Sequence, residues 1–329
     1  MGDGAKLRPA KAMSVGAWAL RAALALLALW IAVRLLGLER GYPLVALLSF
    51  TPYAACMAVL ALAVTVAVRR RAEMAVAAVI VIAFALAVLP RAFPSQPADA
   101  PENGVPLSVL TNNLHLGDAD ADALVGLAER VDADVLTVQE LTEGAVKRLR
   151  GAGVDELFPH QVLGPVPAGG AGAGIYSRYP LEEAPPVEGG ISRQVRATLD
   201  VPGTAPIEIV SVHPFPPNST TTPEWEEALE LLPRPDEEVV RILSGDFNAT
   251  FDHDLFRELV ESGYVDAAAA RGQGLVMSWP VEYTTRPRVA IDHVLADERV
   301  HVSAVEIVDL SGSDHRAVSA RLLLPPGHG

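Results

Sequence analysis

The hydrophobic pattern divides the chain into two unlike parts near position 93. Before that point, three long apolar stretches follow one another, at residues 17–38, 42–68 and 74–89. A helix that crosses a bilayer needs about 20 apolar residues, with about 17 as a working minimum. We therefore expect residues 1–93 to form an all-α membrane anchor of three transmembrane helices.

The first and third stretches reach spanning length only under one condition each. The first does so if Arg21 and Arg34 extend their charged ends towards opposite faces of the membrane. The third does so if its helix continues past Pro90 to Phe93. A signal peptide is the rival interpretation of the first stretch, but no clear small-x-small cleavage site precedes the next long apolar run.

Basic residues in the short connecting segments predict the orientation of this anchor. Three basic residues precede the first stretch, and Arg69, Arg70 and Arg71 separate the second from the third. The loop between the first two stretches carries only the oppositely charged pair Glu39 and Arg40. We therefore expect a multi-pass protein of the cell membrane, with a cytoplasmic N-terminus and everything after the anchor outside the cytoplasm.

Short apolar runs alternate with helical patterns from Pro106 onwards. The segment 94–105 is rich in Pro, Ala and acidic residues and is expected to be a linker. Strands of mixed spacing predict an α+β layered domain over residues 106–329 rather than a repeating βαβ barrel. The expected strands are 107–112, 134–138, 174–176, 195–201, 207–213, 239–244, 289–295, 301–308 and 317–324, and the expected helices are 119–131, 143–150, 222–232 and 254–262.

Charged residues are also distributed unevenly between the parts before and after position 93. Ten of the 26 Lys and Arg residues, but only three of the 40 Asp and Glu residues, lie before Pro94, so the remainder has a net charge of −21. A domain this acidic repels polyanions unless it carries a local basic patch or bound cations. The charge therefore argues against long DNA as the natural substrate.

Polar residues of a few types follow the predicted strands, where loops can present them to a common site. They are Asn112 and Asn113, Glu140, His213, Asp246 and Asn248, Asp292 and His293, and Asp314 and His315. Carboxylate and amide oxygens are the ligands that Mg²⁺ prefers, and substrate phosphate completes its coordination. The sequence contains no HExxH motif and a single cysteine, which argues against a structural or protease-type zinc site.

These residues lie in short motifs, which read NLH, VQE, GIYSRYP, VSVHP, GDFNA, IDHVL and SDHRA in chain order. The series resembles the endonuclease/exonuclease/phosphatase superfamily, which includes deoxyribonuclease I, and the resemblance covers residues 106–324. It implies a four-layer α/β/β/α sandwich and a metal-dependent phosphoric ester hydrolase, either a phosphatase or a phosphodiesterase. The implied cofactor is Mg²⁺, with Mn²⁺ as a possible substitute.

The resemblance also implies which residues bind the metal ion. Glu140 matches the principal metal carboxylate of the family, and Asp314 would lie at the metal. Asn113, rather than Asn112, matches the metal-shell amide, because it directly precedes the apolar residue of its motif.

Five further motif residues are implied in catalysis. His213 would donate a hydrogen bond to the scissile phosphate. Asp246 would orient or deprotonate the attacking water, and Asn248 would contact phosphate or metal. Asp292 would hold the imidazole of His315, which can then stay cationic and stabilise the charge that develops on the phosphoryl group.

Five other residues have weaker signals. Arg193 and Arg196 lie on a strand that leads into the site region and could bind phosphate, with surface salt bridges as the alternative. His115 and His293 are expected to be neighbours of functional residues. Trp279 is expected to pack in the core, with the rim of the site or an apolar part of the substrate as the alternative contact.

Two functions compete. The first is hydrolysis of a lipid-linked phosphate or pyrophosphate of the cell envelope, with the lipid bilayer as partner. The overall build resembles the membrane-anchored teicoplanin-resistance proteins of actinomycetes, which implies a link to glycopeptide resistance. A proline-rich loop after His213 suits a lid or contact with a membrane-borne substrate. The alternative is an extracellular Mg²⁺-dependent endonuclease or exonuclease. The sequence shows no basic, aromatic-interleaved insertion of the kind that grips a DNA groove, which argues against this alternative. No protein partner can be predicted.

Overall fold

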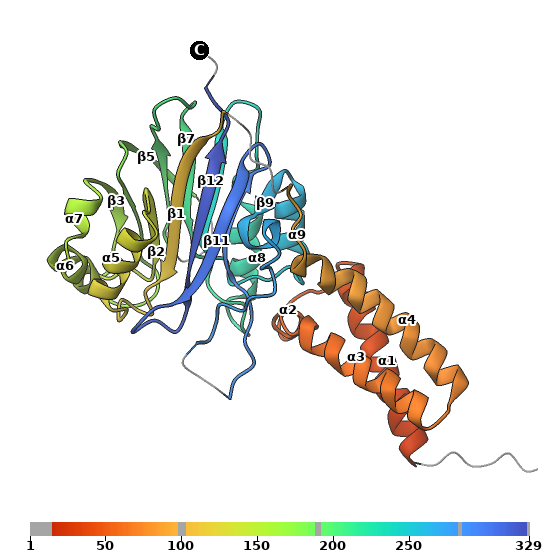
Figure 1. Cartoon of the computed structure of the whole chain (residues 1–329). Coiled ribbons are helices and arrows are strands. Elements are labelled where there is room, and N and C mark those ends of the chain that lie inside the picture. The colour runs from red at the N-terminus through yellow and green to blue at the C-terminus, as the bar shows by residue number, and fades with distance from the viewer. Residues whose placement is uncertain (1–14, 98–102, 188–191, 282–284, 328–329) are drawn as a thin grey trace, which may run out of the picture.

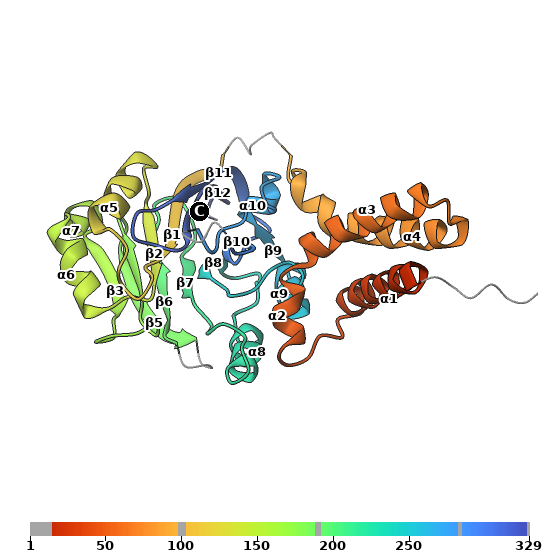
Figure 2. The same ribbon diagram turned by 90° about the horizontal axis from the view of Figure 1, so that it is seen from below.

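The computed structural model describes the chain except for residues 1–14, 98–102, 188–191, 282–284 and 328–329. A helical bundle and a layered α/β domain are joined at one end of the bundle (Figure 1). The bundle leaves the domain on the side of helices α8 (Thr222–Glu230) and α9 (Asp254–Glu261), as the second view also shows (Figure 2). Part of the expected linker, residues 98–102, lies outside the described residues.

The bundle contains three long apolar helices and one short helix. They are α1 (Val15–Leu35), α2 (Leu44–Leu48), α3 (Thr51–Ala67) and α4 (Arg71–Val88), which the 3-10 turn η1 (Leu89–Ala92) extends. Buried Ala58, Ala77 and Phe84 lie between α1, α3 and α4. Small alanine side chains allow helix backbones to approach closely, so an Ala-rich apolar sequence forms a compact bundle.

The helix boundaries change the expected number of spans. Val15–Leu35 and Arg71–Ala92 are long and apolar enough to cross a membrane, by length and composition alone. The expected continuous span over residues 42–68 is instead divided into α2 and the 17-residue α3. Pro52 lies in the first turn of α3, where proline favours a helix start. The structure thus gives two candidate spans and one shorter apolar helix, rather than three long spans.

Two mixed six-stranded sheets form the centre of the domain. The strands are β1 (Val105–Asn113), β2 (Val135–Gln139), β3 (His160–Gly164), β4 (Ala173–Ser177), β5 (Leu181–Val187), β6 (Gln194–Leu199), β7 (Ile207–Val212), β8 (Val240–Asp246), β9 (Tyr264–Asp266), β10 (Asp292–Asp297), β11 (His301–Asp309) and β12 (Arg316–Leu324). The first sheet has the order β11-β12-β1-β2-β4-β3, and the second has the order β5-β6-β7-β8-β10-β9. In the first sheet β1 and β2 are parallel, and in the second sheet β7 and β8 are parallel. The other neighbouring strands are antiparallel.

The domain has the four-layer arrangement that the family resemblance implies. Buried aliphatic side chains such as Val109 and Ile209 fill the space between the two sheets. The outer helices on the first sheet are α5 (Ala121–Arg130), α6 (Glu143–Gly151) and α7 (Val154–Leu157), while α8 and α9 cover the second sheet, and the short α10 (Ala267–Ala270) follows β9. Because both faces of each sheet are covered, central strands such as β7 are buried along their whole length.

A buried ion pair joins the bundle to the domain. Arg34 Nε donates to Asp252 Oδ1 at 3.2 Å, and Arg91 Nη1 donates to Asp252 Oδ2 at 2.8 Å. All three side chains are buried. Arg34, in the last turn of α1, therefore directs its guanidinium out of the end of the bundle and into the layered domain.

Three further hydrogen bonds fix the joint. The side chain of Gln96 donates to Val300 O at 3.0 Å and accepts from Val302 N at 2.8 Å, so this part of the expected linker is docked on the domain. His253 Nε2 lies 3.0 Å from Val45 O of α2. The short helix α2 is thereby held against the domain at the start of α9.

Candidate active site

The candidate catalytic residues gather at one edge of the two sheets. They are Asn113 at the end of β1, Glu140 after β2, His213 after β7, Asp246 at the end of β8, Asp292 at the start of β10, and Asp314 and His315 before β12. Strands β10 and β12 run antiparallel to β8 and β1, so their starts lie where β8 and β1 end. Residues spread over some 200 positions therefore meet because of the sheet topology.

The side chain of Asn113 connects two carboxylates. Its Nδ2 donates to Glu140 Oε1 at 3.2 Å and to Asp246 Oδ2 at 3.0 Å. The preceding residue, Asn112, points to the other face of the strand, where its Nδ2 lies 3.5 Å from His315 O. The structure therefore places Asn113, and not Asn112, beside the acidic groups.

Two site residues have a left-handed backbone. The φ angles of Glu140 and Asn248 are 57° and 46°. Such angles are uncommon for residues other than glycine and cluster at functional sites. Leu116 N donates to Glu140 Oε2 at 2.5 Å, and Asn248 N donates to Asp246 Oδ1 at 2.8 Å. These bonds hold the turns that present the side chains to the site.

Glycine precedes Asp246 because strands approach closely here. A Cβ atom at Gly245 would lie 2.1 Å from Val212 O and 2.9 Å from Gln139 Nε2. Gln139 Nε2 in turn donates to Ser211 Oγ at 3.1 Å, in a buried polar layer between the two sheets. This layer fixes the ends of β2, β7 and β8 relative to one another directly beneath the site.

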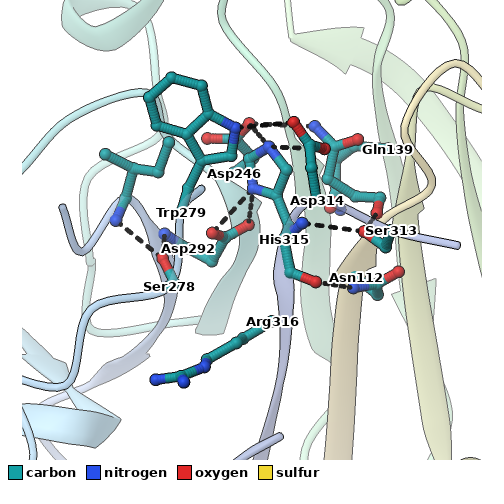
Figure 3. A network of polar contacts seen from close by, with 12 residues as sticks. Asn112, Gln139, Asp246, Ser278, Trp279, Asp292, Ser313, Asp314, His315 and Arg316 are labelled. Carbon is teal, nitrogen blue, oxygen red and sulfur yellow. Dashed lines mark hydrogen bonds and ion pairs between the residues drawn. The ribbon is translucent and has the colours of Figure 1, made fainter. Parts of the chain in front are cut away.

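His315 lies among three carboxylates (Figure 3). Its Nδ1 is 3.0 Å from Asp292 Oδ2, and its Nε2 is 3.8 Å from both Asp246 Oδ2 and Asp314 Oδ1. Burial alone would lower the pKa of His315, but the charges of Asp292, Asp246 and Asp314 outweigh burial and raise that pKa to about 10. His315 is therefore a cation that can stand beside a phosphoryl group and stabilise negative charge on it.

Burial shifts the pKa values of two neighbouring groups, Asp246 and His213, in opposite directions. It raises the pKa of Asp246 to about 7, although the charge of His315 lowers it in part. It lowers the pKa of His213 to about 4, although Glu140 acts in the opposite sense. His213 Nε2 is 3.7 Å from Asp246 Oδ2. Neutral His213 can donate a hydrogen bond to a phosphate oxygen, and a carboxylate with a pKa near neutrality can take a proton from water.

A divalent cation fits these donors. Asp246, Asp292 and His315 each offer a ligand atom, and the three atoms lie within 4.8 Å of one another. Burial and the charge of Asp292 raise the pKa of Asp246, and a bound cation would act in the opposite sense. A protonated imidazole is a poor ligand, so the carboxylate oxygens of Asp246 and Glu140, which Asn113 Nδ2 bridges, suit a hard cation better. When bound, such an ion neutralises charge on the phosphoryl oxygens.

Asp314, the third expected metal ligand, is held by Trp279. The indole Nε1 donates to Asp314 Oδ2 at 2.9 Å, and the indole ring lies 6.1 Å from the ring of His315 (Figure 3). Trp279 is half-buried and lines the site cavity. The structure thus places Trp279 at the rim of the site rather than in the core, and His115 Nδ1 lies 3.9 Å from Asp314 Oδ1.

The site opens into a cavity of about 470 Å³. Glu140, Asp246 and His315 form part of its polar side. The proline-rich loop after His213 also lines it, through Pro216 and Pro217.

Another wall of the cavity comes from the bundle, through Ala46, Ser49 and Phe50. Sequence reasoning missed these three residues because they fall within the stretch interpreted as one continuous span. The signal that could have found them is Pro52, which marks the start of a new helix directly after Phe50.

Two candidate phosphate ligands lie elsewhere, and His293 is a buried neighbour of the site. Arg193 and Arg196 line a separate cavity of about 180 Å³, and Arg196 is ion-paired with Glu208. Neither arginine is among the described residues that line the site cavity, so the geometry does not support them as phosphate ligands. His293 is buried and its Nδ1 lies 2.8 Å from Asp266 Oδ2, which assigns it to packing beneath the site.

Sequence comparison agrees with the motifs. The sequence profile of the endonuclease/exonuclease/phosphatase family matches residues 110–315, which is more than half of the chain. The matched region begins in β1 and ends at His315. No curated protein is similar enough in sequence to match this chain.

Solved structures share the fold at low sequence identity. An endonuclease/exonuclease/phosphatase from Beutenbergia cavernae DSM 12333 is 20% identical, with a TM-score of 0.53 over 67% of this chain and 72% of that chain. D. rerio TDP2, complexed with single-strand DNA product, is 17% identical, with a TM-score of 0.53 over 66% of this chain and 98% of that chain. A functionally unknown conserved protein from Enterococcus faecalis V583 is 15% identical, with a TM-score of 0.51 over 67% of this chain and 100% of that chain.

The family match covers the strands that carry the site, and the solved structures share the two-sheet fold. The buried carboxylates at the sheet edge, with His315 beside them, form a candidate site for a divalent metal. The chain is thus a metal-dependent phosphoesterase, and it belongs to the endonuclease/exonuclease/phosphatase family.

Proposed function

We propose that this protein is a membrane-anchored phosphoesterase that uses Mg²⁺ to hydrolyse a lipid-linked phosphate or pyrophosphate outside the cytoplasm. One observation carries the proposal: Ala46 and Phe50 of the bundle line the same cavity as Asp246 and His315. A phosphate bound at the polar side of this cavity has its substituent next to the apolar bundle. An active site built against such a bundle suits a substrate that resides in a membrane.

The surface of the bundle supports its placement in a bilayer. Among the described residues, 24 large hydrophobic side chains are exposed, and all but Leu116 and Leu231 lie between Val15 and Phe93. Soluble monomers rarely expose a contiguous apolar surface of this extent. We infer that α1, α3 and α4 all cross the membrane. The 17 residues of α3 span about 26 Å, close to the roughly 30 Å of a hydrocarbon core.

The charge of the connecting segments supports an outward catalytic domain. Helix α1 begins, and α3 connects to α4, at the end of the bundle far from the domain (Figures 1 and 2). Arg69, Arg70 and Arg71 lie in that distal connection. Basic segments beside membrane helices stay in the cytoplasm, which leaves the opposite end of the bundle and the catalytic domain outside.

A Mg²⁺-dependent endonuclease or exonuclease is the second candidate. The fold likeness to D. rerio TDP2, which was solved with a single-strand DNA product, favours it. The net charge of −21 beyond Phe93 opposes it, because polyanion binding depends on positive charge at the protein surface. The lipid-linked substrate is therefore the stronger candidate.

Two parts of the proposal concern the ion and the physiological role. Oxygen donors at the site favour Mg²⁺, with Mn²⁺ as a substitute. If the lipid carries cell-wall precursors, its hydrolysis would influence glycopeptide resistance. The resemblance of the overall build to membrane-anchored teicoplanin-resistance proteins supports this role. A host that expresses the wild-type protein should then tolerate more teicoplanin than one that expresses Asp246→Asn, and equal tolerance would contradict this role.

The central experiment compares two substrates at equal phosphate concentration. Full-length protein with Mg²⁺ should release phosphate from polyprenyl pyrophosphate in mixed micelles faster than it nicks plasmid DNA. Asp246→Asn should abolish the release, which ties it to this site. Rapid nicking that depends on Asp246, without phosphate release from the lipid, would overturn the lipid proposal and establish the nuclease.

A further inference from the structure

Phe50 lies where the active-site cavity meets the bundle. It directly precedes α3, is half-buried and lines the cavity together with the catalytic residues. Its ring centroid is 6.2 Å from that of Tyr53, in the first turn of α3, and Tyr53 is exposed. The apolar surface of the cavity therefore continues onto the outside of α3.

One face of α3 extends this surface along the bundle. Tyr53, Met57, Leu60 and Val64 are all exposed large apolar side chains. Their spacing of four, three and four positions places them on a single face of the helix, and together they extend over about 16 Å. Ala58, on the opposite side of α3, is buried in the bundle. We call these four exposed residues the α3 stripe.

Inside the cavity, apolar side chains begin directly beside the catalytic groups. Leu116, whose backbone nitrogen donates to Glu140, is 52% exposed and lines the cavity. Ile291, which also lines it, directly precedes Asp292. A hydrocarbon that begins at the phosphate ester oxygen would meet apolar surface at once, whereas a glycerol or sugar would place hydroxyl groups there.

The volume of the cavity limits what it holds. At about 470 Å³ it lies within the roughly 300–1,000 Å³ of small-molecule sites, so it admits a pyrophosphate and only the first part of a long chain. The remainder of the chain has to leave the cavity. The α3 stripe supplies an apolar path that begins at Phe50, on the opening of the cavity towards the bundle.

Resting on the proposed function, we propose that Phe50 and the α3 stripe bind the hydrocarbon of the substrate, which is a phosphate or pyrophosphate ester of a long-chain alcohol. The phosphate lies at Glu140 and Asp246, and the chain passes Phe50 and follows α3 into the membrane. The bundle is then part of the substrate-binding site as well as an anchor.

The first test is a chain-length series with full-length protein in lipid nanodiscs. Phosphate release is measured from isopentenyl, geranyl and farnesyl pyrophosphate. The kcat/KM of the wild type should rise along the series, because each isoprene unit adds apolar contact. Phe50→Ala should lower the ratio of the farnesyl to the isopentenyl value by about tenfold, the scale of one apolar contact in a pocket. Phe93→Ala, the same substitution at an exposed position outside the described cavity lining, should keep the ratio.

The second test addresses the α3 stripe with a matched pair. Met57 and Val59 are each 55% exposed, but Val59 lies on a different face of α3. Met57→Gln should raise the KM for polyprenyl pyrophosphate severalfold in the same nanodiscs, and Val59→Gln should not. Equal effects of the two substitutions would remove the stripe from the substrate path.

The outcomes separate this inference from the function on which it rests. If the wild type releases phosphate from all three pyrophosphates at one kcat/KM, or if Phe50→Ala preserves the ratio, the hydrocarbon site is wrong and the phosphoesterase remains. If no prenyl pyrophosphate is hydrolysed while plasmid DNA is nicked, the proposed lipid function itself fails.

Discussion

The carboxylate of Asp252 accepts a hydrogen bond from Arg91 at 2.8 Å, although the two residues are 161 positions apart in the chain. Arg34 adds a second contact to the same carboxylate from α1. Because the group is buried and shared by two guanidinium groups, its removal leaves two positive charges without their partner. That loss costs more than the net contribution of the intact pairs.

Asp252→Asn should therefore lower the free energy of unfolding by roughly 3 kcal/mol, the scale of a broken buried ion pair. Denaturant titration of the full-length protein in detergent measures this change. Glu306→Gln is the control, because the ion pair of Glu306 with Arg130 is more than half exposed and contributes little. Equal stability of Asp252→Asn and the wild type would contradict the structural role of the joint.

Glu140→Gln should weaken metal dependence. The substitution removes one negative charge from the expected coordination of the cation while barely changing the shape of the side chain. The Mg²⁺ concentration for half-maximal activity should rise at least tenfold, and calorimetry should show the same weakening of Mg²⁺ binding. Glu143→Gln, at an exposed position in the first turn of α6, serves as the control. Full wild-type activity in EDTA would remove the metal from this account.

Asp292→Asn should reduce kcat by about a hundredfold or more, with a smaller effect on KM, because a neutral amide no longer stabilises cationic His315. Ser278→Ala should give a milder loss of kcat, since Ser278 Oγ only positions Asp292 by accepting from its backbone nitrogen at 3.1 Å. Steady-state phosphate release gives both constants. A wild-type kcat for Asp292→Asn would exclude His315 as a stabilising cation.

Acidification should destabilise the protein through His253. Thr250 N donates to His253 Nδ1 at 2.9 Å, so Nδ1 is unprotonated and Nε2 donates to Val45 O. Burial lowers the pKa of His253 from 6.5 to about 4; Asp252 acts in the opposite sense, and Arg257 and Arg91 in the same sense. Between these values the unfolded chain binds a proton that the folded chain does not, so stability falls as the pH falls.

The loss assigned to His253 amounts to roughly 3 kcal/mol between pH 6.5 and pH 4. Unfolding of wild type and His253→Gln at several pH values isolates this contribution, because other titrating groups are common to both proteins. The two stability curves should converge as the pH falls. Curves that stay parallel over this range would show that His253 does not titrate as its surroundings indicate.

A topology reporter tests the orientation. An enzyme that is active only outside the cytoplasm should be active when fused after Phe93, and a cytoplasm-only reporter there should be silent. Replacement of Arg69, Arg70 and Arg71 by glutamine should weaken this bias, because these charges are its main source. The reverse pattern would indicate an even number of spans.

The strand ends explain how much of the site could be predicted from the sequence. Each motif residue follows or precedes a run of buried apolar residues, so the pattern located both the strand and the functional residue at its end. The runs before Glu140 and Asp246 are fully or almost fully buried in β2 and β8. What local pattern could not provide is the partner of each group, such as Trp279 for Asp314, because that contact depends on the tertiary fold.

The strands that the sequence did not predict are β3, β5 and β9, and all three lie at sheet edges. An edge strand pairs on one side only, so its apolar pattern is weaker than that of a central strand. Strand β5 also contains Pro185 and Pro186, which a central strand would exclude, and its pairing with β6 is irregular between Ala184 and Val187. The local sequence of these edges resembles that of loops.

The break between α2 and α3 was missed for the opposite reason, because the hydrophobic signal of the N-terminal part is too uniform. Over residues 42–68 nearly every position is apolar, and periodicity cannot distinguish a membrane helix from two helices that also contact a domain. The few positions that interrupt the pattern are Pro43, Ser49, Thr51, Pro52 and Thr65. The contribution of Phe50 to the cavity depends on a turn between α2 and α3 that the apolar run conceals.

If the bundle spans a membrane as proposed, the joint at Asp252 also sets how the enzyme meets a lipid substrate. A domain on a flexible tether samples a range of heights and tilts above a bilayer, whereas a domain locked to its bundle keeps its catalytic opening at one fixed level. With the bundle in a membrane, encounters arise from lateral diffusion in two dimensions. Turnover should then follow the mole fraction of the lipid in the leaflet, and dilution of the vesicles in buffer should leave the rate per enzyme unchanged.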